Sequence, residues 1–161
     1  MPKSDLSRRT CTVARTAEMI GDSWSQMIIH ELFLGTRRFD EMQKLTGASP
    51  HLISVRLKRL EAEGVVRREA YSTRPLRHEY RLTEKGRDLW PVIIAMKSWG
   101  DRWLETPDET PITLTHTACG HETKPHLVCS ACNEPIQAVT TSFAISEDMQ
   151  AERRSVLHPE N

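Results

Sequence analysis

The sequence predicts a mainly α-helical domain that carries one small β-hairpin, followed by a small segment rich in cysteine and histidine. Apolar residues recur at helical spacing through the first hundred residues, with glycines between the helices. Two strand-like runs flank a basic, proline-containing tip near residues 72–77, and paired Cys and His residues follow between 112 and 138. With 161 residues, 38% of them hydrophobic, the chain can form one domain with a core and an appendage.

Composition and punctuation divide the chain into five expected segments. They are a flexible N-terminus (1–10), a main domain (11–105), a linker (106–111), the Cys/His segment (112–138) and a flexible tail (139–161). Residues 1–10 contain no apolar run of the signal-peptide kind, and no stretch is long enough to cross a membrane. We therefore expect a cytoplasmic protein with no membrane partner, whose four cysteines stay mostly reduced.

The formal net charge is zero, but the charges are unevenly distributed. Residues 1–105 hold 19 Lys and Arg against 14 Asp and Glu, whereas residues 106–161 hold 3 against 8. This asymmetry favours a basic binding domain with an acidic appendage, although both halves would also be compatible with ordinary solvated surfaces.

The first two helices are expected at 11–20 and 23–34. Apolar residues mark one face of each, at Val13, Ala14, Ala17 and Ile20 in the first helix. Gly21 and Asp22 interrupt the pattern, and Gly35 ends the second helix.

A compact pair of helices follows. Phe39, Met42 and Leu45 recur in steps of three, and Gly47 suits a tight turn with positive φ. Ser49 is expected to cap the next helix, with Pro50 at its first position, and this helix is expected to continue to about residue 63. Its core face is expected to comprise Leu52, Ile53, Leu57 and Leu60.

The hairpin strands are expected at 65–71 and 78–82, with Pro75 in the turn. Thr83 is expected to cap a final helix that reaches about Leu104 and is kinked at Pro91. Its apolar residues step by three and four, which suits packing against the same helix of a second copy. This expected dimer interface comprises Leu89, Val92, Met96, Trp99 and Trp103.

Helix, glycine turn, capped helix and basic hairpin follow one another in the order of a winged helix-turn-helix. The major groove of duplex DNA, about 12 Å wide, admits one helix, whose N-terminal residues reach the base edges. Side chains of the 49–63 helix are expected at bases or phosphates, and arginines of the hairpin at the backbone or minor groove. The expected DNA-binding residues are Arg38, Ser49, Pro50, His51, Ser54, Val55, Arg56, Lys58, Arg59, Arg74 and Arg77.

Six short runs in order resemble the HxlR-type family of winged-helix regulators. They are Cys11–Thr16, Ile20–Trp24, Arg38–Met42, Ser54–Leu60, Glu63–Arg67 and Arg77–Gly86, and the resemblance covers roughly residues 11–104. It implies a homodimer packed through terminal helices that binds inverted-repeat operators.

Cys11 opens the first expected helix, near several arginines in sequence. A helix N-terminus and nearby cations both favour the thiolate, and the resemblance implies that a cysteine at this place can sense oxidants or electrophiles. The alternative is a small residue that fills a gap near the dimer interface. A small aromatic effector is a further hypothesis, since four tryptophans either line a pocket or belong to the core: Trp24, Trp90, Trp99 and Trp103.

Two pairs with the same spacing, His116 with Cys119 and Cys129 with Cys132, predict a structural zinc site. Three thiolates and one imidazole favour zinc, and four protein ligands leave no open position for catalysis. His121 and His126 are rival fourth ligands. A zinc-ribbon-like module is the leading interpretation; a redox cluster of the three cysteines and a ribbon without metal remain alternatives.

These patterns favour a sequence-specific regulator that binds double-stranded DNA, and we expect a repressor. The alternative is a winged-helix and zinc-ribbon module that binds proteins in a transcription complex. We expect no enzymatic activity, because the sequence shows no nucleophile–base signature, phosphate-binding glycine loop or carboxylate-bearing metal site.

Overall fold

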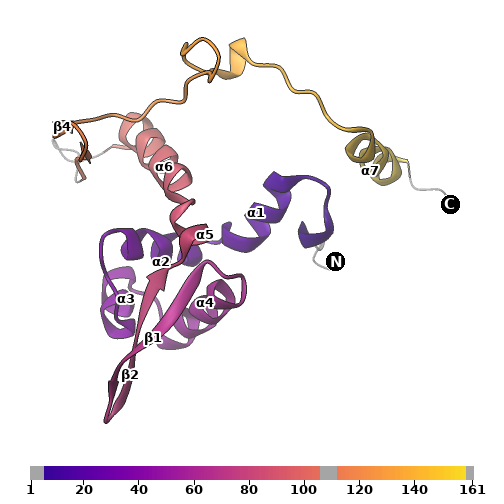
Figure 1. The fold of residues 1–161 in the computed structure, drawn as a ribbon. Coiled ribbons are helices and arrows are strands. Elements are labelled where there is room, and N and C mark those ends of the chain that lie inside the picture. The colour runs from indigo at the N-terminus through magenta and orange to yellow at the C-terminus, as the bar shows by residue number, and fades with distance from the viewer. Residues whose placement is uncertain (1–5, 106–111, 159–161) are drawn as a thin grey trace. The chain divides into compact units, whose positions relative to one another are not determined.

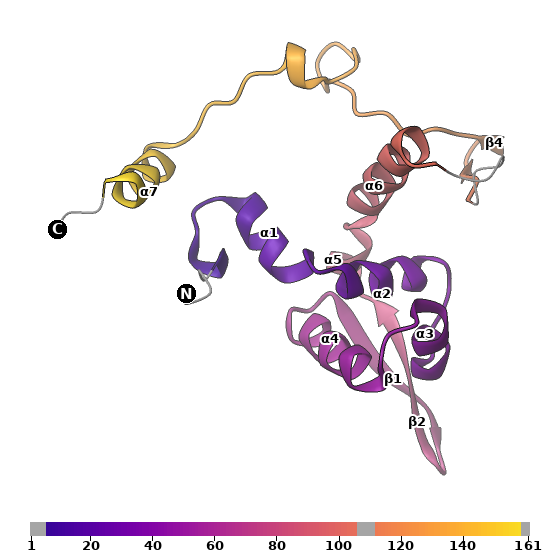
Figure 2. The ribbon, with the colours of Figure 1, turned by 180° about the vertical axis from the view of Figure 1, so that it is seen from behind.

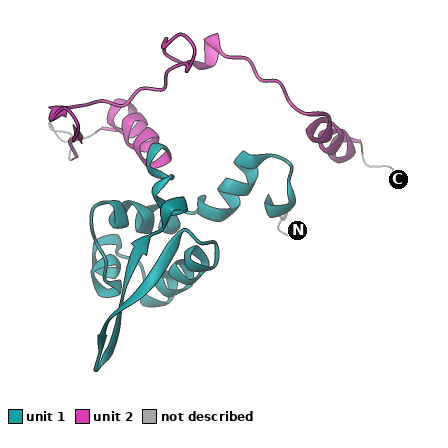
Figure 3. Ribbon diagram, viewed as in Figure 1, with its two compact units in different colours: residues 1–91 teal, residues 92–161 magenta. Residues whose placement is uncertain are grey.

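The computed structural model describes residues 6–105 and 112–158. The chain divides into two compact units, residues 1–91 and residues 92–161 (Figure 3). The expected linker, 106–111, lies outside the described residues. Each unit is described separately below.

Helices α2, α3 and α4 pack together in the first unit (Figures 1 and 2). The helices of this unit are η1 (Leu6–Arg8), α1 (Thr12–Ile20), α2 (Ser23–Phe33), α3 (Phe39–Thr46), α4 (Pro50–Ala62) and α5 (Glu84–Arg87). Apolar side chains from α2, α3, α4 and the start of the hairpin make up the core. The most deeply buried are Ile28, Ile29, Leu32, Met42, Ile53, Leu57, Leu60, Val65 and Val66.

The turn between α3 and α4 has the local structure that the sequence predicts. Gly47 ends α3 with a φ of 69°, in the left-handed region where glycine is favoured. Ser49 caps α4, and its hydroxyl accepts a hydrogen bond of 3.3 Å from the backbone nitrogen of Leu52. Pro50 occupies the first turn of α4. The helix-turn-helix expectation is therefore confirmed at the level of backbone and caps.

The hairpin consists of β1 (Val66–Thr73) and β2 (Leu76–Leu82), paired antiparallel. It projects beyond the helices (Figure 1). It is longer than the sequence predicted, since the pairs Ser72–Arg77 and Thr73–Leu76 extend the ladder and shorten the connection to residues 74–75. Pro75 does lie in the turn, where it removes no hydrogen bond from the ladder.

The long kinked helix expected after Thr83 is instead two helices. Thr83 caps the four-residue α5 as expected, its hydroxyl accepting a 3.1 Å hydrogen bond from the backbone nitrogen of Gly86. A new helix, α6, begins at Trp90 and ends at Trp103. Pro91 has no N–H and a fixed φ, so it is better placed in the first turn of a helix than in its interior. The expectation of a kink was therefore wrong, and the proline marks the start of a helix.

Two residues of the apolar patterns that the sequence shows in α1 and α3 are exposed in the structure. Val13 on α1 is 74% exposed and Leu45 on α3 is 61% exposed. Helical spacing identifies a face, but only the packing of the whole unit decides how wide the buried stripe is.

The second unit holds most of α6, two short strands and a final helix. The strands β3 (Thr115–His116) and β4 (His121–Glu122) pair antiparallel, and η2 (Ala138–Thr140) and α7 (Glu147–Leu157) follow. The segment expected to be a flexible tail thus contains a helix, capped by the hydroxyl of Ser146, with no buried residue. No helix in the described parts of the chain is long and apolar enough to span a bilayer.

Candidate nucleic-acid interface

One face of α4 packs into the core and the other is open to solvent. Ile53, Leu57 and Leu60 are almost fully buried and fix the rotation of the helix about its axis. The solvent side carries the expected contact residues, all exposed except the half-buried Ser54: Ser49, Pro50, His51, Ser54, Val55 and Lys58. The first turn contains no acidic residue, so nothing there opposes an approaching phosphate.

Arg56 and Arg59, also expected at DNA, lie half-buried between α4 and the preceding helices. Arg56 Nε is 3.0 Å from Asp22 Oδ1. Arg59 donates hydrogen bonds to the backbone carbonyl and, at 3.1 Å, to the carboxylate of Glu18. In this structure both guanidinium groups hold α4 against α1 and α2.

Asp22 is the centre of a small polar network at the start of α2. It caps the helix by accepting hydrogen bonds from the backbone nitrogen of Ser25 at 3.1 Å and from its hydroxyl at 2.5 Å. Partial burial acts to raise the pKa of the Asp22 carboxyl, but the hydrogen bonds from Ser25 and the charge of Arg56 outweigh it and leave the pKa below its ordinary value. From the sequence, Gly21-Asp22 was expected only to interrupt the helical pattern. Asp is a favoured N-cap residue, and its position directly before an apolar-periodic run was the signal that could have identified the cap.

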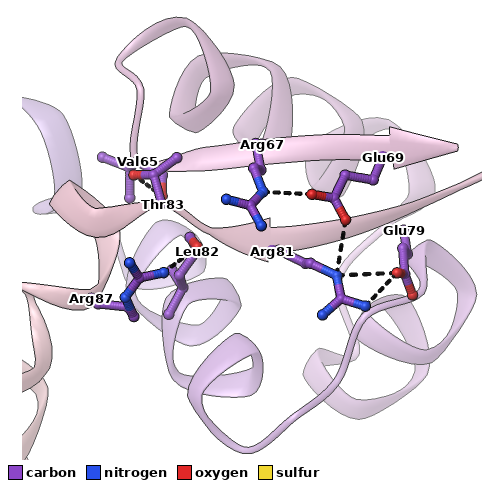
Figure 4. A network of polar contacts seen from close by, with 8 residues as sticks. All are labelled: Val65, Arg67, Glu69, Glu79, Arg81, Leu82, Thr83 and Arg87. Carbon is purple, nitrogen blue, oxygen red and sulfur yellow. Dashed lines mark hydrogen bonds and ion pairs between the residues drawn. The ribbon is translucent and has the colours of Figure 1, made fainter.

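The arginines of the hairpin differ in their partners, and one of them, Arg68, lies 3.9 Å from Glu61 of α4. Arg67 and Arg81 lie along the hairpin and are bridged by Glu69, and Arg81 also pairs with Glu79 (Figure 4). Their nitrogen–oxygen distances are 2.6 Å for Arg67–Glu69, 3.1 Å for Arg81–Glu69 and 2.6 Å for Arg81–Glu79. These charges are neutralised within the hairpin.

Arg74 and Arg77, the two arginines expected at DNA, are exposed at the tip of the hairpin. Among the ion pairs of the described residues, none involves either side chain. The tip therefore presents two positive charges to solvent, unlike the paired arginines nearer the helices.

Arg38 lies where the hairpin meets the helix-turn-helix. It precedes α3, forms an isolated antiparallel bridge with Glu79, and places its guanidinium carbon 5.2 Å from the centre of the Tyr71 ring. The carbonyl of its neighbour Arg37 accepts a 2.8 Å hydrogen bond from the backbone nitrogen of Tyr80. The hairpin is thus tied to the chain that enters α3.

A buried carboxylate in α2 escaped the sequence analysis. Glu31 is only 7% exposed, and its Oε2 accepts a 3.0 Å hydrogen bond from the hydroxyl of Thr36. His30 Nδ1 lies 4.0 Å from the other oxygen. A polar residue, His30, precedes Glu31 directly, and nothing in the local sequence indicated that this carboxylate would be buried.

The apolar seam expected as a dimer interface is largely open to solvent in the single chain. Leu89 is half-buried, while Trp99 and Trp103 on α6 are 59% and 62% exposed. Val92 and Met96 are exposed on the same helix. Of the other tryptophans, Trp24 is half-buried and Trp90 packs edge-on against Phe33, with ring centroids 5.0 Å apart.

The candidate sensor and metal residues have these positions. Cys11 is the half-buried N-cap residue of α1, and its thiol makes no capping hydrogen bond.

The candidate metal ligands lie in the Cys/His segment, where His116 Nδ1 is 3.3 Å from Cys119 Sγ. The pKa of the Cys129 thiol is below its ordinary value because the backbone N–H groups of Ala131 and Cys132 and the thiol of Cys132 hydrogen-bond to it. Within the described parts of the chain, no three His, Cys, Asp or Glu side chains are gathered closely enough to hold one ion.

The fold just described matches a family model named HxlR-like helix-turn-helix over residues 19–108. The chain belongs to this family. A curated relative from Mycobacterium tuberculosis strain H37Rv, the uncharacterized HTH-type transcriptional regulator Rv3095, is 42% identical over 140 residues, which cover 86% of this chain and 89% of the relative. This HxlR-like protein is accordingly a DNA-binding transcriptional regulator, a role that is not enzymatic in its homologues.

Two solved structures are also similar. The candidate transcription factor PA1607 matches with a TM-score of 0.74 and 32% identity over 87% of this chain and 98% of that one. The redox regulator HypR in its oxidized form matches with a TM-score of 0.56 and 34% identity over 60% of this chain and all (100%) of HypR.

The similarity to Rv3095 extends past the helix-turn-helix domain. Only 18 residues precede the segment matched by the family model, so an alignment over 86% of the chain must include about 30 residues or more beyond residue 108. Part of the segment beyond residue 108 is therefore shared with this relative.

Proposed function

We propose that this HxlR-like protein is a repressor that binds an inverted-repeat operator as a homodimer. The observation that carries the proposal is the solvent face of α4, which the buried side of the same helix holds in a fixed rotation. That face is free of acidic side chains through its first turn and carries groups able to hydrogen-bond base edges.

Within this face, the residues divide by the contact that their chemistry suits. Ser49, His51 and Ser54 can hydrogen-bond base edges, and Pro50 or Val55 can contact a thymine methyl group. Lys58, one turn further along α4, suits a phosphate. Because Arg56 and Arg59 are held by Asp22 and Glu18, we assign them to supporting the helix unless binding exchanges those partners for phosphates.

The arginines at the hairpin tip suit the DNA backbone or the neighbouring minor groove. Arg74 and Arg77 are exposed and, among the described ion pairs, take part in none, so they can meet phosphates without first losing a carboxylate partner. Arg38, whose guanidinium lies beside the ring of Tyr71 on β1, is a further candidate for a backbone contact.

The exposed apolar side of α6 supports dimerisation. Val92, Met96, Trp99 and Trp103 recur at helical spacing, and all four are more than 40% exposed in the single chain. A second copy of the same helix would remove this surface from water, in the manner of a two-helix seam. Two copies would then present two α4 helices to one inverted repeat.

Selection of fragments of the source genome by the purified full-length protein, near physiological salt, tests this proposal. We expect enrichment of one inverted repeat whose half-sites are about one helical turn apart. Lys58→Ala should weaken binding to it, whereas Lys85→Ala should not. Lys85 has the same charge but donates to the carbonyl of Glu63, beyond the other end of α4.

Binding that is weak, unselective and insensitive to Lys58→Ala would contradict the proposal. It would favour a module that binds proteins in a transcription complex. Recovery of direct repeats or single half-sites would contradict the symmetric dimer, but it would still agree with DNA binding by the solvent face of α4.

We also propose that oxidants or electrophiles regulate DNA binding through Cys11. The thiol lies half-buried at the N-terminus of α1, and HypR, to which the chain is similar, is a redox regulator. We expect peroxide or quinone treatment to change operator affinity in the native protein and not in Cys11→Ser. Equal responses of the two proteins would exclude Cys11 as the sensor.

A further inference from the structure

The Cys/His segment is built from two hairpins of the same length and design. Residues 114–123 form the first and residues 127–136 form the second, displaced by 13 positions. The sequence alone did not reveal this repeat, because few residue types are shared between the two copies.

Corresponding hydrogen bonds show that the two backbones are equivalent. At the open ends, Thr123 donates to Leu114 at 2.8 Å and Ile136 donates to Leu127 at 2.9 Å. The next cross-strand pairs, Thr115–Glu122 and Val128–Pro135, also correspond.

The turns are equivalent as well. Gly120 donates to the carbonyl of His116, and Asn133 donates to that of Cys129, both at 2.8 Å. Gly120 has a φ of 73° and Asn133 a φ of 61°, the one positive φ of a non-glycine residue among those described. A left-handed asparagine is uncommon, so its occurrence where the first hairpin has glycine indicates that both turns require this conformation.

The four metal-ligand side chains fall at two equivalent positions of this repeat. His116 corresponds to Cys129 at the end of the first strand, and Cys119 corresponds to Cys132 in the turn. In the first hairpin, His116 Nδ1 and Cys119 Sγ are 3.3 Å apart. With Zn–N near 2.0 Å and Zn–S near 2.3 Å, two ligands of a tetrahedral zinc ion lie about 3.5 Å apart, so this pair is already close to the required spacing.

The repeat also decides between the histidines. His121 corresponds to Glu134 in the second hairpin, and His126 lies in the connection between the hairpins. Neither occupies a ligand position of the repeat, whereas His116 does.

We propose that one Zn²⁺ ion joins the two hairpins through His116 Nδ1 and the thiolates of Cys119, Cys129 and Cys132. The three thiols release their protons to solvent on binding. Since these groups are not gathered together within the described residues, the hairpins must approach each other when the ion binds.

The connection permits this approach. Residues 124–126 join the open ends of the hairpins and allow a separation of at most about 14 Å between residues 123 and 127. Neighbouring strands need about 5 Å and stacked sheets about 10 Å. Two hairpins joined at their open ends can therefore lie alongside each other with both turns at the same end, and a four-ligand ion there would be structural.

The test is metal binding by the full-length chain, stripped of metal with a chelator and kept reduced. Native mass spectrometry during a zinc titration should give one ion per chain, and Co²⁺ used as a probe should show the absorption of a tetrahedral site with thiolate ligands. Cys129→Ser and His116→Ala should each weaken zinc binding by more than about 100-fold. Loss of a residue that only hydrogen-bonds to a ligand costs roughly 10–100-fold in metal affinity.

His121→Ala and His126→Ala are the matched controls and should bind as the native chain does. His116→Cys should keep one ion per chain while its Co²⁺ spectrum gains thiolate character, which separates loss of a ligand from loss of folding. Absence of stoichiometric binding at micromolar zinc would overturn the proposal. So would one ion per two chains, or an effect of His121→Ala or His126→Ala equal to that of His116→Ala.

Discussion

Replacing Asp22 by alanine should destabilise the first unit by about 2–5 kcal/mol. Loss of a helix N-cap costs about 1 kcal/mol. The hydroxyl of Ser25, whose residue is fully buried at 0% exposure, would lose its acceptor, which costs about 1–3 kcal/mol. The ion pair with Arg56 is partly exposed and adds at most about 1 kcal/mol. Against a total stability of about 5–15 kcal/mol for a typical domain, this loss is large.

Asp22→Asn separates the charge from the cap. Asparagine keeps one oxygen that can accept from the backbone nitrogen of Ser25, and its NH2 can donate to the Ser25 hydroxyl oxygen in place of the bond that Oδ2 accepted. The cap is therefore retained, and the charge-dependent part that is lost is at most about 1 kcal/mol at neutral pH. Because the folded-state pKa of Asp22 is depressed, the stability it adds is present above the ordinary carboxyl pKa, near 3.9, and is lost as pH falls through the folded value. The difference between the native chain and Asp22→Asn should therefore narrow below about pH 4.

Urea denaturation at one fixed protein concentration, followed by far-UV circular dichroism, measures both effects. If the urea midpoint of Asp22→Ala at pH 7 corresponds to less than about 0.5 kcal/mol of destabilisation, the stabilising role assigned to the Asp22 network is refuted. A gap between the native chain and Asp22→Asn that stays constant from pH 7 to pH 3 would refute the role assigned to the charge.

Three further outcomes are expected. A plot of log affinity for the operator against log salt concentration should have a slope about one unit less steep for Lys58→Ala, and likewise for Arg77→Ala. An unchanged slope in either variant would show that the replaced side chain does not contact a phosphate. Gly86→Ala should cost at least about 1–3 kcal/mol in urea denaturation, since a Cβ there would lie 2.1 Å from a backbone carbonyl oxygen, whereas Gly100→Ala, with its nearest neighbour at 3.6 Å, should be neutral or stabilising. Trp99→Glu should shift the sedimentation of the full chain from dimer to monomer at micromolar concentration without loss of helix content, and a persistent dimer would place the interface elsewhere.

Local signals in the sequence were sufficient for much of the fold. Three local features depend on backbone conformations that few residue types favour: the glycine turn at Gly47, the Ser49–Pro50 helix start and the turn at Pro75. The residue types at these positions were therefore sufficient to locate them. The core face of α4 followed from helical spacing and is confirmed for Ile53, Leu57 and Leu60.

The errors arose where several elements decide the outcome together. Pro91 can either kink a helix or begin one, and the choice depends on whether the preceding turn ends, as it does at Asp88. Leu45 fits a helical face but lies outside the part of it that other elements cover.

The sequence predicted where the candidate site lies, but it did not predict which of its charged side chains are paired with carboxylates. Which residues of α4 face the solvent followed from the pattern, but the pairing of Arg56 and Arg59 with carboxylates far away in the sequence did not. Ion pairs of this kind depend on how helices are placed beside one another, which local patterns do not encode.

The backbone bond from Tyr80 to Arg37 and the bridge from Arg38 to Glu79 join the hairpin to the segment that leads into α3. The hairpin and the helix pair are thereby linked through the middle of β2, so each proposed half-site would be read by a single preassembled unit. In the proposed dimer, the adjustable quantities would then be the distance and angle between two such units, not the shape of either one. A signal arriving at α1 or α6 could therefore change operator affinity severalfold while every residue that touches DNA kept its local geometry.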